Sequence, residues 1–303
     1  MPLGKALIYC CRPFHAQQSD FTDKLLLVIC PRTLGKKMSY SQRMTSGMID
    51  THCHLVDNKF KSDVDDVIQR AKQSGVQCAV VCPEYASQFD AVLDLYAQHT
   101  DFVIPAIGIH PIQKKNKSVK ISDIDGVQAF LEEHRGVVKC IGEIGLDFTQ
   151  HYKITPDDIL VQKEVLLKHI GWAKQFRLPM TVHSRSATGD TVDFLIENAA
   201  DRVALHAFNG TLEEALRGLQ AGFFFSIPPS FTTGDHKRFL LEAVPIEQLL
   251  LETDSPVLGP VRGERNEPAN LKLSADFIAE VKNLPVEEVI SATTANARKL
   301  LGI

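Results

Sequence analysis

The chain has 303 residues, of which 44% are hydrophobic and 23% are charged, so it is long enough to bury a core and is not a low-complexity or disordered polymer. Its formal net charge of -4 argues against a protein that binds nucleic acid by bulk charge. Any polyanionic substrate must therefore be held locally, by a few side chains or by metal.

The cysteines and the apolar runs indicate a soluble intracellular protein. Seven cysteines are an odd number and lie without a disulfide framework, which is typical of reduced thiols. The longest apolar run near the start covers residues 25–30 and stops at Pro31, whereas about 18 residues are needed to cross a bilayer. We therefore expect no membrane association and a cytoplasmic or nuclear location.

The first 46 residues differ in charge from the rest of the chain. They contain seven basic and two acidic residues and show no sustained periodicity. We interpret residues 1–46 as a basic, disordered leader and residues 47–303 as one hydrolase domain. A targeting peptide is the alternative for the leader, although Asp20, Asp23 and the apolar run 25–30 spoil the amphipathic pattern of such peptides.

From Met48 onward, short apolar runs alternate with stretches of helical period. The predicted strands are 48–54, 76–82, 102–109, 137–144, 179–183, 203–206, 223–227 and 249–253. The predicted helices are 63–74, 87–99, 122–134, 157–177, 188–199, 212–221, 235–244, 271–282 and 286–300. Eight strands that alternate with helices predict an α/β fold, a (β/α)8 TIM barrel, with a doubly wound open sheet as the alternative.

Titratable residues end most of these predicted strands. Asp50, His52 and His54 end the first strand and share one face, because side chains alternate along a strand with period two. The corresponding residues of later strands are His110, Glu143, Asp147, His183, His206 and Asp254. A single strand-end histidine is usually structural, but so many together at the catalytic end of a barrel predict a metal site.

The residue types of this cluster indicate which ions it holds. Imidazole and carboxylate ligands suit Zn²⁺ best and also admit Mg²⁺ or Mn²⁺. Four histidines and two carboxylates are too many ligands for one tetrahedral ion that keeps an open position for water. We therefore expect two divalent ions per chain. Two ions about 3.5–4 Å apart can activate a water molecule and stabilise both the attacking and the leaving oxygen of a phosphoester.

A series of motifs over residues 48–303 resembles the TatD family of metal-dependent deoxyribonucleases, which are amidohydrolase-like barrels. The motifs are DTHCH, GIHP, IGEIGLD, VHSR, HAFNG, ETDSP and RNEP, in this order. The resemblance implies that His52, His54 and Asp254 hold one ion, that Glu143 bridges both, and that His183 and His206 complete the second. Glu143 and Asp254 are then the catalytic carboxylates, with Asp254 as the proton acceptor.

Other residues near these motifs are expected to support the ligands or hold the substrate. Asp50 would crowd the ion, so it is expected to orient an imidazole, and His110 and Asp147 are assigned similar supporting roles. Arg185, Arg265 and Asn266 are candidates to hold phosphate oxygens, although either arginine could instead form a structural salt bridge. The lysines between 114 and 120 are interpreted as a solvated, mobile loop rather than as a nucleic-acid path.

The function expected from these observations is a divalent-metal-dependent deoxyribonuclease that cleaves DNA phosphodiester bonds with a hydroxide activated by two metals. The alternative is an amidohydrolase-type hydrolase of small C–N or C–O acyl substrates. A scaffold with a vestigial site is a third reading, and the complete ligand set counts against it. DNA is expected as the substrate, no protein partner is inferred, and the chain is expected to act as a monomer.

Overall fold

The apolar runs of the sequence form a parallel sheet of eight strands in the computed structural model, which describes residues 47–233 and 237–303. In spatial order the strands are β1 (Met48–Cys53), β2 (Val76–Val81), β3 (Val103–Ile107), β6 (Cys140–Gly145), β7 (Met180–His183), β8 (Val203–Leu205), β9 (Phe224–Ile227) and β10 (Leu249–Leu251). All eight predicted strands are confirmed. The expected leader, 1–46, lies outside the described residues.

The sheet curves until its first and last strands meet. Just beyond β10, the backbone N–H of Asp254 donates to the carbonyl of His52 over 2.9 Å, and the N–H of His54 donates to the carbonyl of Ser255 over 2.7 Å. These bonds join the carboxyl ends of β1 and β10, so the sheet is a nearly closed barrel. The doubly wound open sheet, which keeps two free edges, is therefore excluded.

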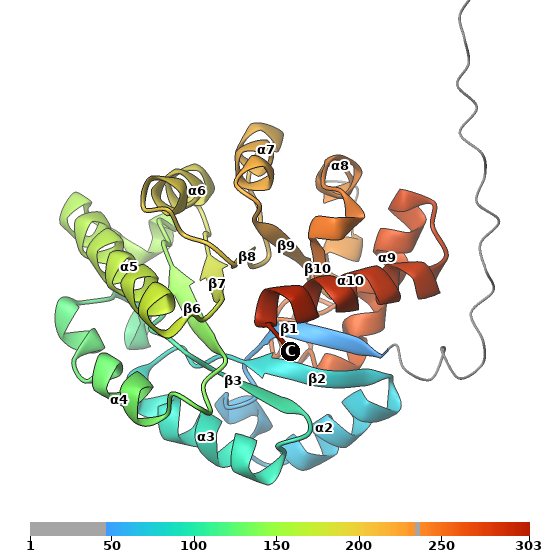
Figure 1. Cartoon of the computed structure of the whole chain (residues 1–303), viewed down its shortest axis with the longest axis horizontal. Helices are drawn as coiled ribbons and strands as arrows, with labels where there is room; N and C mark the ends of the chain where they lie inside the picture. Colours follow the sequence, from blue (N-terminus) through green and yellow to red (C-terminus); the bar gives the residue numbers. More distant parts are fainter. Residues whose placement is uncertain (1–46, 234–236) are drawn as a thin grey trace, which may run out of the picture. The chain divides into compact units, whose positions relative to one another are not determined.

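Helices lie outside the ring of strands (Figure 1). They are α2 (Val64–Gln73), α3 (Phe89–Gln98), α4 (Val127–Glu133), α5 (Pro156–Phe176), α6 (Thr188–Glu197), α7 (Leu212–Gln220), α8 (Arg238–Ala243), α9 (Leu271–Lys282) and α10 (Val286–Leu301). Short 3-10 turns are η1 (Asn58–Phe60), η2 (Ala86–Gln88), η3 (Lys114–Asn116), η4 (Ile121–Ile124), η5 (Gln150–Tyr152), η6 (Pro229–Thr233), η8 (Ile246–Gln248) and η9 (Pro268–Asn270). No helix within 47–233 or 237–303 is long and apolar enough to cross a membrane.

The chain provides start and stop signals for these helices. α5 begins with Thr155, whose hydroxyl accepts from the Asp158 N–H while the Asp158 carboxylate accepts from the Thr155 N–H. Pro156 follows at the first helical position, where its missing N–H costs nothing. α4 starts later than its predicted start at 122, because Gly126 adopts a left-handed conformation with φ of 78° and separates η4 from α4.

The lysine-rich segment after β3 forms a short hairpin, and its lysines are exposed, as expected for a solvated segment. β4 (Ile112–Gln113) and β5 (Lys117–Ser118) pair antiparallel. The Gln113 side-chain amide donates to the carbonyls of Glu84 and His110, and Val119 N–H donates to the carbonyl of Pro111. These bonds fasten the hairpin beside the carboxyl end of the barrel.

The alternation of side chains along the strands divides the barrel into an apolar and a polar part. A buried cluster combines strand residues such as Ile49, Val80 and Leu250 with Leu300 and Leu301 of α10. Further along the same face of β10 come Glu252 and Asp254, which are also buried. The polar part of the barrel therefore rests on the apolar part, and the candidate functional residues lie at the carboxyl ends of the strands.

Candidate metal centre

Two histidines and two carboxylates at the carboxyl ends of the strands converge at one point: His52 in β1, His54 just after it, Glu143 in β6 and Asp254 beyond β10. The Nε2 atoms of His52 and His54 lie 3.2 Å apart. Glu143 Oε2 lies 3.4 Å from His52 Nε2 and 3.2 Å from His54 Nε2. Asp254 Oδ1 lies 3.6 and 3.2 Å from the same two nitrogens. Four donor atoms with no apolar group between them therefore face one another in a buried site.

The spacing of these four atoms fits a metal ion. Zinc binds imidazole nitrogen and carboxylate oxygen at about 2.0–2.2 Å, which places neighbouring ligand atoms of a tetrahedron roughly 3.3–3.6 Å apart. The separations that involve the two imidazole nitrogens run from 3.2 to 3.6 Å. Two buried carboxylates that face the same pair of imidazoles also favour a cation between them, so both the geometry and the charges fit divalent metal.

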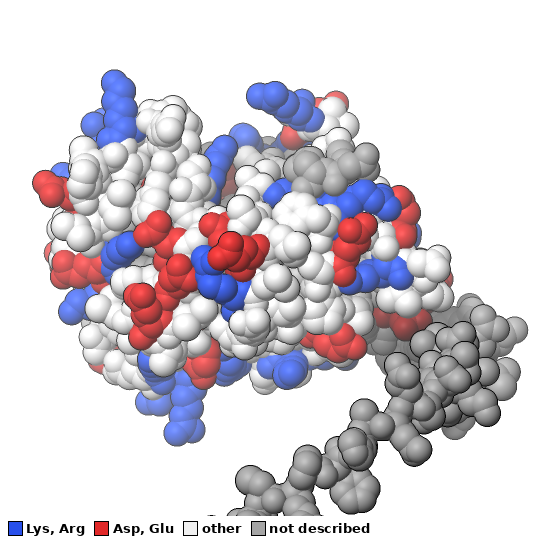
Figure 2. Space-filling view, turned by 90° about the horizontal axis from the view of Figure 1, so that it is seen from above, with Lys and Arg blue, Asp and Glu red and all other residues white. Residues whose placement is uncertain are grey.

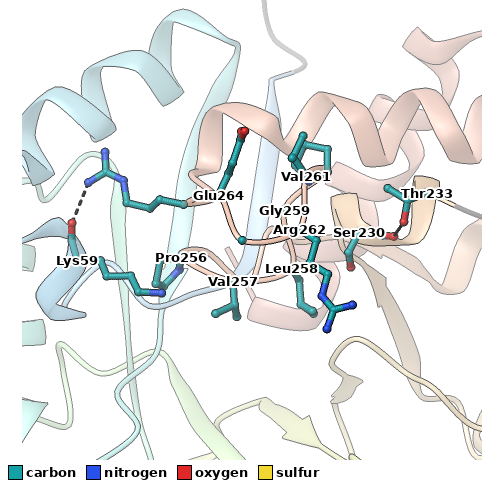
Figure 3. A pocket seen from close by; sticks show the side chains of 13 residues that line it. Lys59, Ser230, Thr233, Pro256, Val257, Leu258, Gly259, Val261, Arg262 and Glu264 are labelled. Atoms are coloured by element: carbon teal, nitrogen blue, oxygen red, sulfur yellow. Dashed lines mark hydrogen bonds between the residues drawn. The ribbon is translucent and has the colours of Figure 1, made fainter.

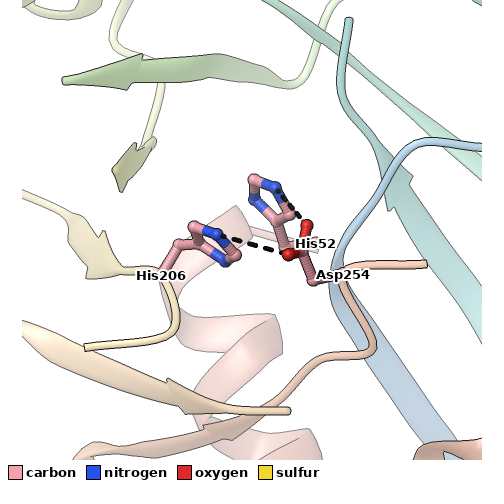
Figure 4. A group of neighbouring side chains, drawn as sticks. All are labelled: His52, His206 and Asp254. Carbon is pink, nitrogen blue, oxygen red and sulfur yellow. Dashed lines mark ion pairs between the residues drawn. The ribbon is translucent and has the colours of Figure 1, made fainter. Parts of the chain in front are cut away.

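A second group of donors surrounds the other oxygen of Glu143. Its Oε1 lies 2.8 Å from His183 Nδ1, 3.6 Å from His110 Nε2 and 3.7 Å from His206 Nε2. His206 Nε2 also lies 3.9 Å from the second oxygen of Asp254. Figure 4 shows Asp254 with one oxygen directed toward His52 and the other toward His206. Each carboxylate therefore contacts both groups of donors.

His110, which was expected to support a ligand, lies beside the second group of donors. Its Nε2 is 3.6 Å from Glu143 Oε1, and it could hold a metal together with Glu143 and His183. Its Nδ1 accepts from the Ile112 N–H over 2.9 Å, so the β4–β5 hairpin fixes the ring. Burial lowers the pKa of His110 to about 4, which keeps the imidazole neutral and able to bind a cation.

The charges of the cluster are set by burial and by the mutual attraction of its members. Burial alone would raise the pKa of Glu143, but His110, His52 and His183 hold it well below the ordinary value. Burial would also raise the pKa of Asp254, and His206 and His54 lower it instead. Both carboxylates are therefore ionised and available as ligands.

The candidate ligand histidines are oriented by hydrogen bonds on the side of the ring away from the cluster. His52 Nδ1 lies 2.8 Å from the Thr181 hydroxyl, and His54 Nδ1 lies 3.0 Å from the carbonyl of Cys82. His183 Nε2 lies 3.0 Å from Asp147 Oδ2, as the supporting role predicted for Asp147 requires. Such contacts fix the ring orientation and raise the basicity of the ligand nitrogen.

Asp50 is buried beside the cluster but contacts no imidazole ring. Its carboxylate accepts from the backbone N–H groups of His52 and Thr253 and from the Thr253 hydroxyl. Burial raises the pKa of Asp50 to about 8, although these hydrogen bonds favour its charged form. Asp50 therefore ties β1 to the segment that carries Asp254, which positions backbone rather than an imidazole.

Glu252 has a role that the sequence analysis did not assign. It is fully buried, and its carboxylate contacts His206 Nδ1 over 2.9 Å, the Ala207 N–H over 2.9 Å and the Ser226 hydroxyl. Burial would lower the pKa of His206, but the negative charges of Glu252 and Asp254 raise it to about 10. Because side chains alternate along a strand, residues 250, 252 and 254 share one face, and this pattern could have indicated that Glu252 faces the site.

Replacing Glu252 by Gln is expected to weaken metal binding about 10- to 100-fold, because the amide no longer offers a charge to the His206 ring. Metal titration of the purified variant measures this change. Ser226→Ala is the matched control, since it removes a neighbour of Glu252 and leaves the His206 contact in place. Metal affinity equal to that of the wild type in Glu252→Gln would mean that His206 needs no such partner.

A cavity of about 270 Å³ opens onto the cluster. Besides the metal-binding candidates, its lining residues are Asp57, Lys59, Glu84, Tyr152, Arg185, Pro256 and Val257. Arg185 thus lies on the wall of this cavity, beside the candidate metal ligands. Asn266 is buried and donates to the carbonyls of Thr253 and Val257, while Arg265 forms a bidentate pair with Asp63, so both support the loop after β10.

Comparison with known proteins places this geometry in a family. The profile described as TatD related DNase matches residues 49–302. The chain is 42% identical over 258 residues to the Homo sapiens protein named deoxyribonuclease TATDN3, which covers 84% of this chain and 94% of the relative. The chain belongs to the TatD family. The structure also resembles the crystal structure of YjjV, a TatD homolog from Escherichia coli, with a TM-score of 0.76. The two sequences are 28% identical, and the match covers 84% of this chain and 98% of that one.

Another TatD relative bears on the chemistry. It is a Bacillus subtilis protein named uncharacterized metal-dependent hydrolase YabD, 36% identical over 84% of this chain and 99% of the relative. Together with the buried donor groups, this identifies the present TatD chain as a metal-dependent hydrolase that uses divalent metal.

Proposed function

We propose that the chain is a deoxyribonuclease that binds two divalent ions and hydrolyses DNA phosphodiester bonds. The observation that carries the proposal is the placement of Glu143, whose two oxygens face different groups of donors. His52, His54 and Asp254 would hold one ion, and His183 and His206 would hold the other, with Glu143 shared between them. His110 is a further donor for the second ion.

Zn²⁺ is the ion that suits this donor set best, and Mg²⁺ or Mn²⁺ are alternatives. When bound, such ions supply Lewis-acid chemistry, which lowers the pKa of water and neutralises the charge that develops on phosphoryl oxygens. The protein's own side chains position the phosphate and accept the proton. Arg185 on the cavity wall orients the phosphate by charge-assisted hydrogen bonds, and Asp254, at the floor of the cavity, accepts a proton from the attacking water.

The distribution of surface charge supports local binding of DNA. On the face shown in Figure 2, acidic and basic side chains are interspersed, and neither sign forms an extended field. Within the cavity, Lys59 and Arg185 provide positive charge near the metal-binding residues. We also propose that the chain acts as a monomer in the cytoplasm or nucleus.

The test compares substrates and metals on one preparation. Purified protein is stripped with chelator, reloaded separately with Zn²⁺, Mg²⁺ or Mn²⁺, and incubated with single-stranded DNA labelled at either end. Cleavage that requires metal, with two ions bound per chain, is the expected result. A panel of lactones and amides runs in parallel, because turnover of these compounds without cleavage of DNA would support the acyl hydrolase alternative and contradict the proposal.

A further inference from the structure

A second, larger pocket adjoins the cavity above the metal-binding cluster. It has a volume of about 720 Å³ and lies between the loop that follows β10 and the turns η1 and η6 (Figure 3). Pockets of this size hold a ligand about as large as a nucleotide. Lys59, Pro256 and Val257 line both spaces, so the pocket and the catalytic cavity share a wall and form one continuous surface.

The shape of this pocket is fixed by the residues at the end of the loop. Arg265 donates to the carbonyl of Lys59 over 2.8 Å and to both oxygens of Asp63 over 2.7 Å. Asn266 donates to the carbonyls of Thr253 and Val257. Arg265 thus bonds the loop to η1, and Asn266 bonds it to Thr253, just after β10. Because these bonds fix the loop, the pocket is formed before any ligand binds.

Two cations of this pocket have no acidic partner among the described residues. Lys59 and Arg262 both line it, and neither side chain forms a hydrogen bond or ion pair within 47–233 or 237–303. Figure 3 shows Arg262 and Val257 directed to the same side of the loop, whereas Glu264 points to the opposite side. The Arg265 charge is already compensated by Asp63. Lys59 and Arg262 therefore place two uncompensated positive charges on the surface that continues from the catalytic cavity.

An exposed apolar side chain, Val257, lies between these cations (Figure 3). Val257 is 47% exposed and lines the pocket. A wall that combines separated cations with an apolar surface matches a nucleotide, which presents phosphates at both sides and a flat apolar base between them.

We propose that this pocket holds the nucleotide next to the scissile phosphate of a single polynucleotide strand. Lys59 contacts the phosphate nearer to the metal-binding cluster, Arg262 contacts the next phosphate along the strand, and Val257 covers the base or sugar. This inference rests on the proposed nuclease function and deepens it, because it assigns the substrate as a strand with at least one unpaired nucleotide beside the cleaved bond.

The experiment uses the full chain with its metal and three variants: Lys59→Gln, Arg262→Gln and Lys139→Gln. Both pocket residues are exposed, so their replacement should not disturb folding. Lys139 is the matched control because it directly precedes β6, at the opposite end of the barrel from Glu143. The kinetic constants are measured on a labelled single-stranded oligonucleotide and on bis(p-nitrophenyl) phosphate, a small diester without a flanking nucleotide.

Each pocket variant is expected to raise KM for the oligonucleotide about three- to tenfold with little change in kcat. The slope of log KM against log salt concentration should become shallower by about 0.7 for each lost phosphate contact. Arg262 lines only the larger pocket, so Arg262→Gln should hydrolyse the small diester at the wild-type rate, whereas Lys59→Gln should also lose some activity on it because Lys59 lines the catalytic cavity as well. Lys139→Gln should match the wild type on both substrates.

Two negative outcomes are distinguishable. If the wild type cleaves the oligonucleotide and both pocket variants keep its KM and salt slope, the strand does not pass through this pocket and the inference is overturned, while the nuclease function stands. If the wild type cleaves no oligonucleotide but hydrolyses the small diester, the proposed nuclease function itself fails, and this inference fails with it.

Discussion

Glu143→Gln is expected to bind one equivalent of metal or fewer and to lower the rate of hydrolysis by several orders of magnitude. Glu143 presents Oε2 to His52 and His54 and Oε1 to His183. Gln keeps the size of the side chain, but its amide nitrogen is a hydrogen-bond donor and cannot bind a cation. One group of donors therefore loses its carboxylate oxygen, and two cations about 3.5–4 Å apart would face each other with less negative charge between them.

Asp147→Asn is the control for this variant, because it makes the same chemical change at a neighbouring buried carboxylate. Asp147 contacts His183 through Oδ2 and the Thr149 N–H through Oδ1, but neither oxygen lies in the groups of candidate ligands. We expect this variant to keep both ions and to lose much less activity. Metal analysis of the two variants tests whether Glu143 bridges the two ions. Two tightly bound ions in Glu143→Gln would mean that another residue has the bridging role.

The barrel and the convergence of its polar residues could be predicted because both depend on local patterns. Strands buried on both faces read as continuous apolar runs, and period-two alternation places His52 and His54 on one side of β1. The rule that parallel strands carry their chemistry at one end then brings Glu143 and His183 to the same place. None of these steps requires knowledge of which residues touch.

Apart from the supporting position of Asp147, the contacts behind the candidate ligands could not be predicted, because they join residues far apart in the chain. In the sequence, Glu252 is one of the two acidic residues of the ETDSP motif. Its supporting role follows from its contacts with His206 and Ser226 in the fold. Arg265 reads as a phosphate ligand until the fold supplies Asp63 as its partner. Arg262 carries no motif, and the loop geometry alone places it on a pocket that adjoins the catalytic cavity.

Asp254→Asn is the second change expected to have a very large effect, with kcat about 10²- to 10⁴-fold lower because a proton acceptor in the transition state is lost. The variant should fold normally. Asp254 has a backbone φ of 52°, and Asn tolerates this left-handed conformation as well as Asp does. Its backbone hydrogen bond to the carbonyl of His52, which closes the barrel, is also retained.

Asp57→Asn is the matched control for Asp254→Asn, since Asp57 is another carboxylate on the cavity wall. Its side chain accepts from the Lys59 N–H at the start of η1, a capping bond that Asn also forms. Activity within a few-fold of the wild type is expected for this control. It shows whether a loss in Asp254→Asn reflects the position of the charge rather than the total charge of the cavity.

Metal content separates the two roles assigned to Asp254. Its Oδ1 lies 3.2 Å from His54 Nε2, so loss of one ion from Asp254→Asn would mean that the carboxylate acts mainly as a ligand. Two retained ions with a lowered kcat and an unchanged KM would mean that it acts mainly as a proton acceptor, because only an interaction of the transition state would have been removed. Full metal content together with wild-type kcat would contradict both roles and would point to Glu84, the remaining carboxylate on the cavity wall with no assigned role.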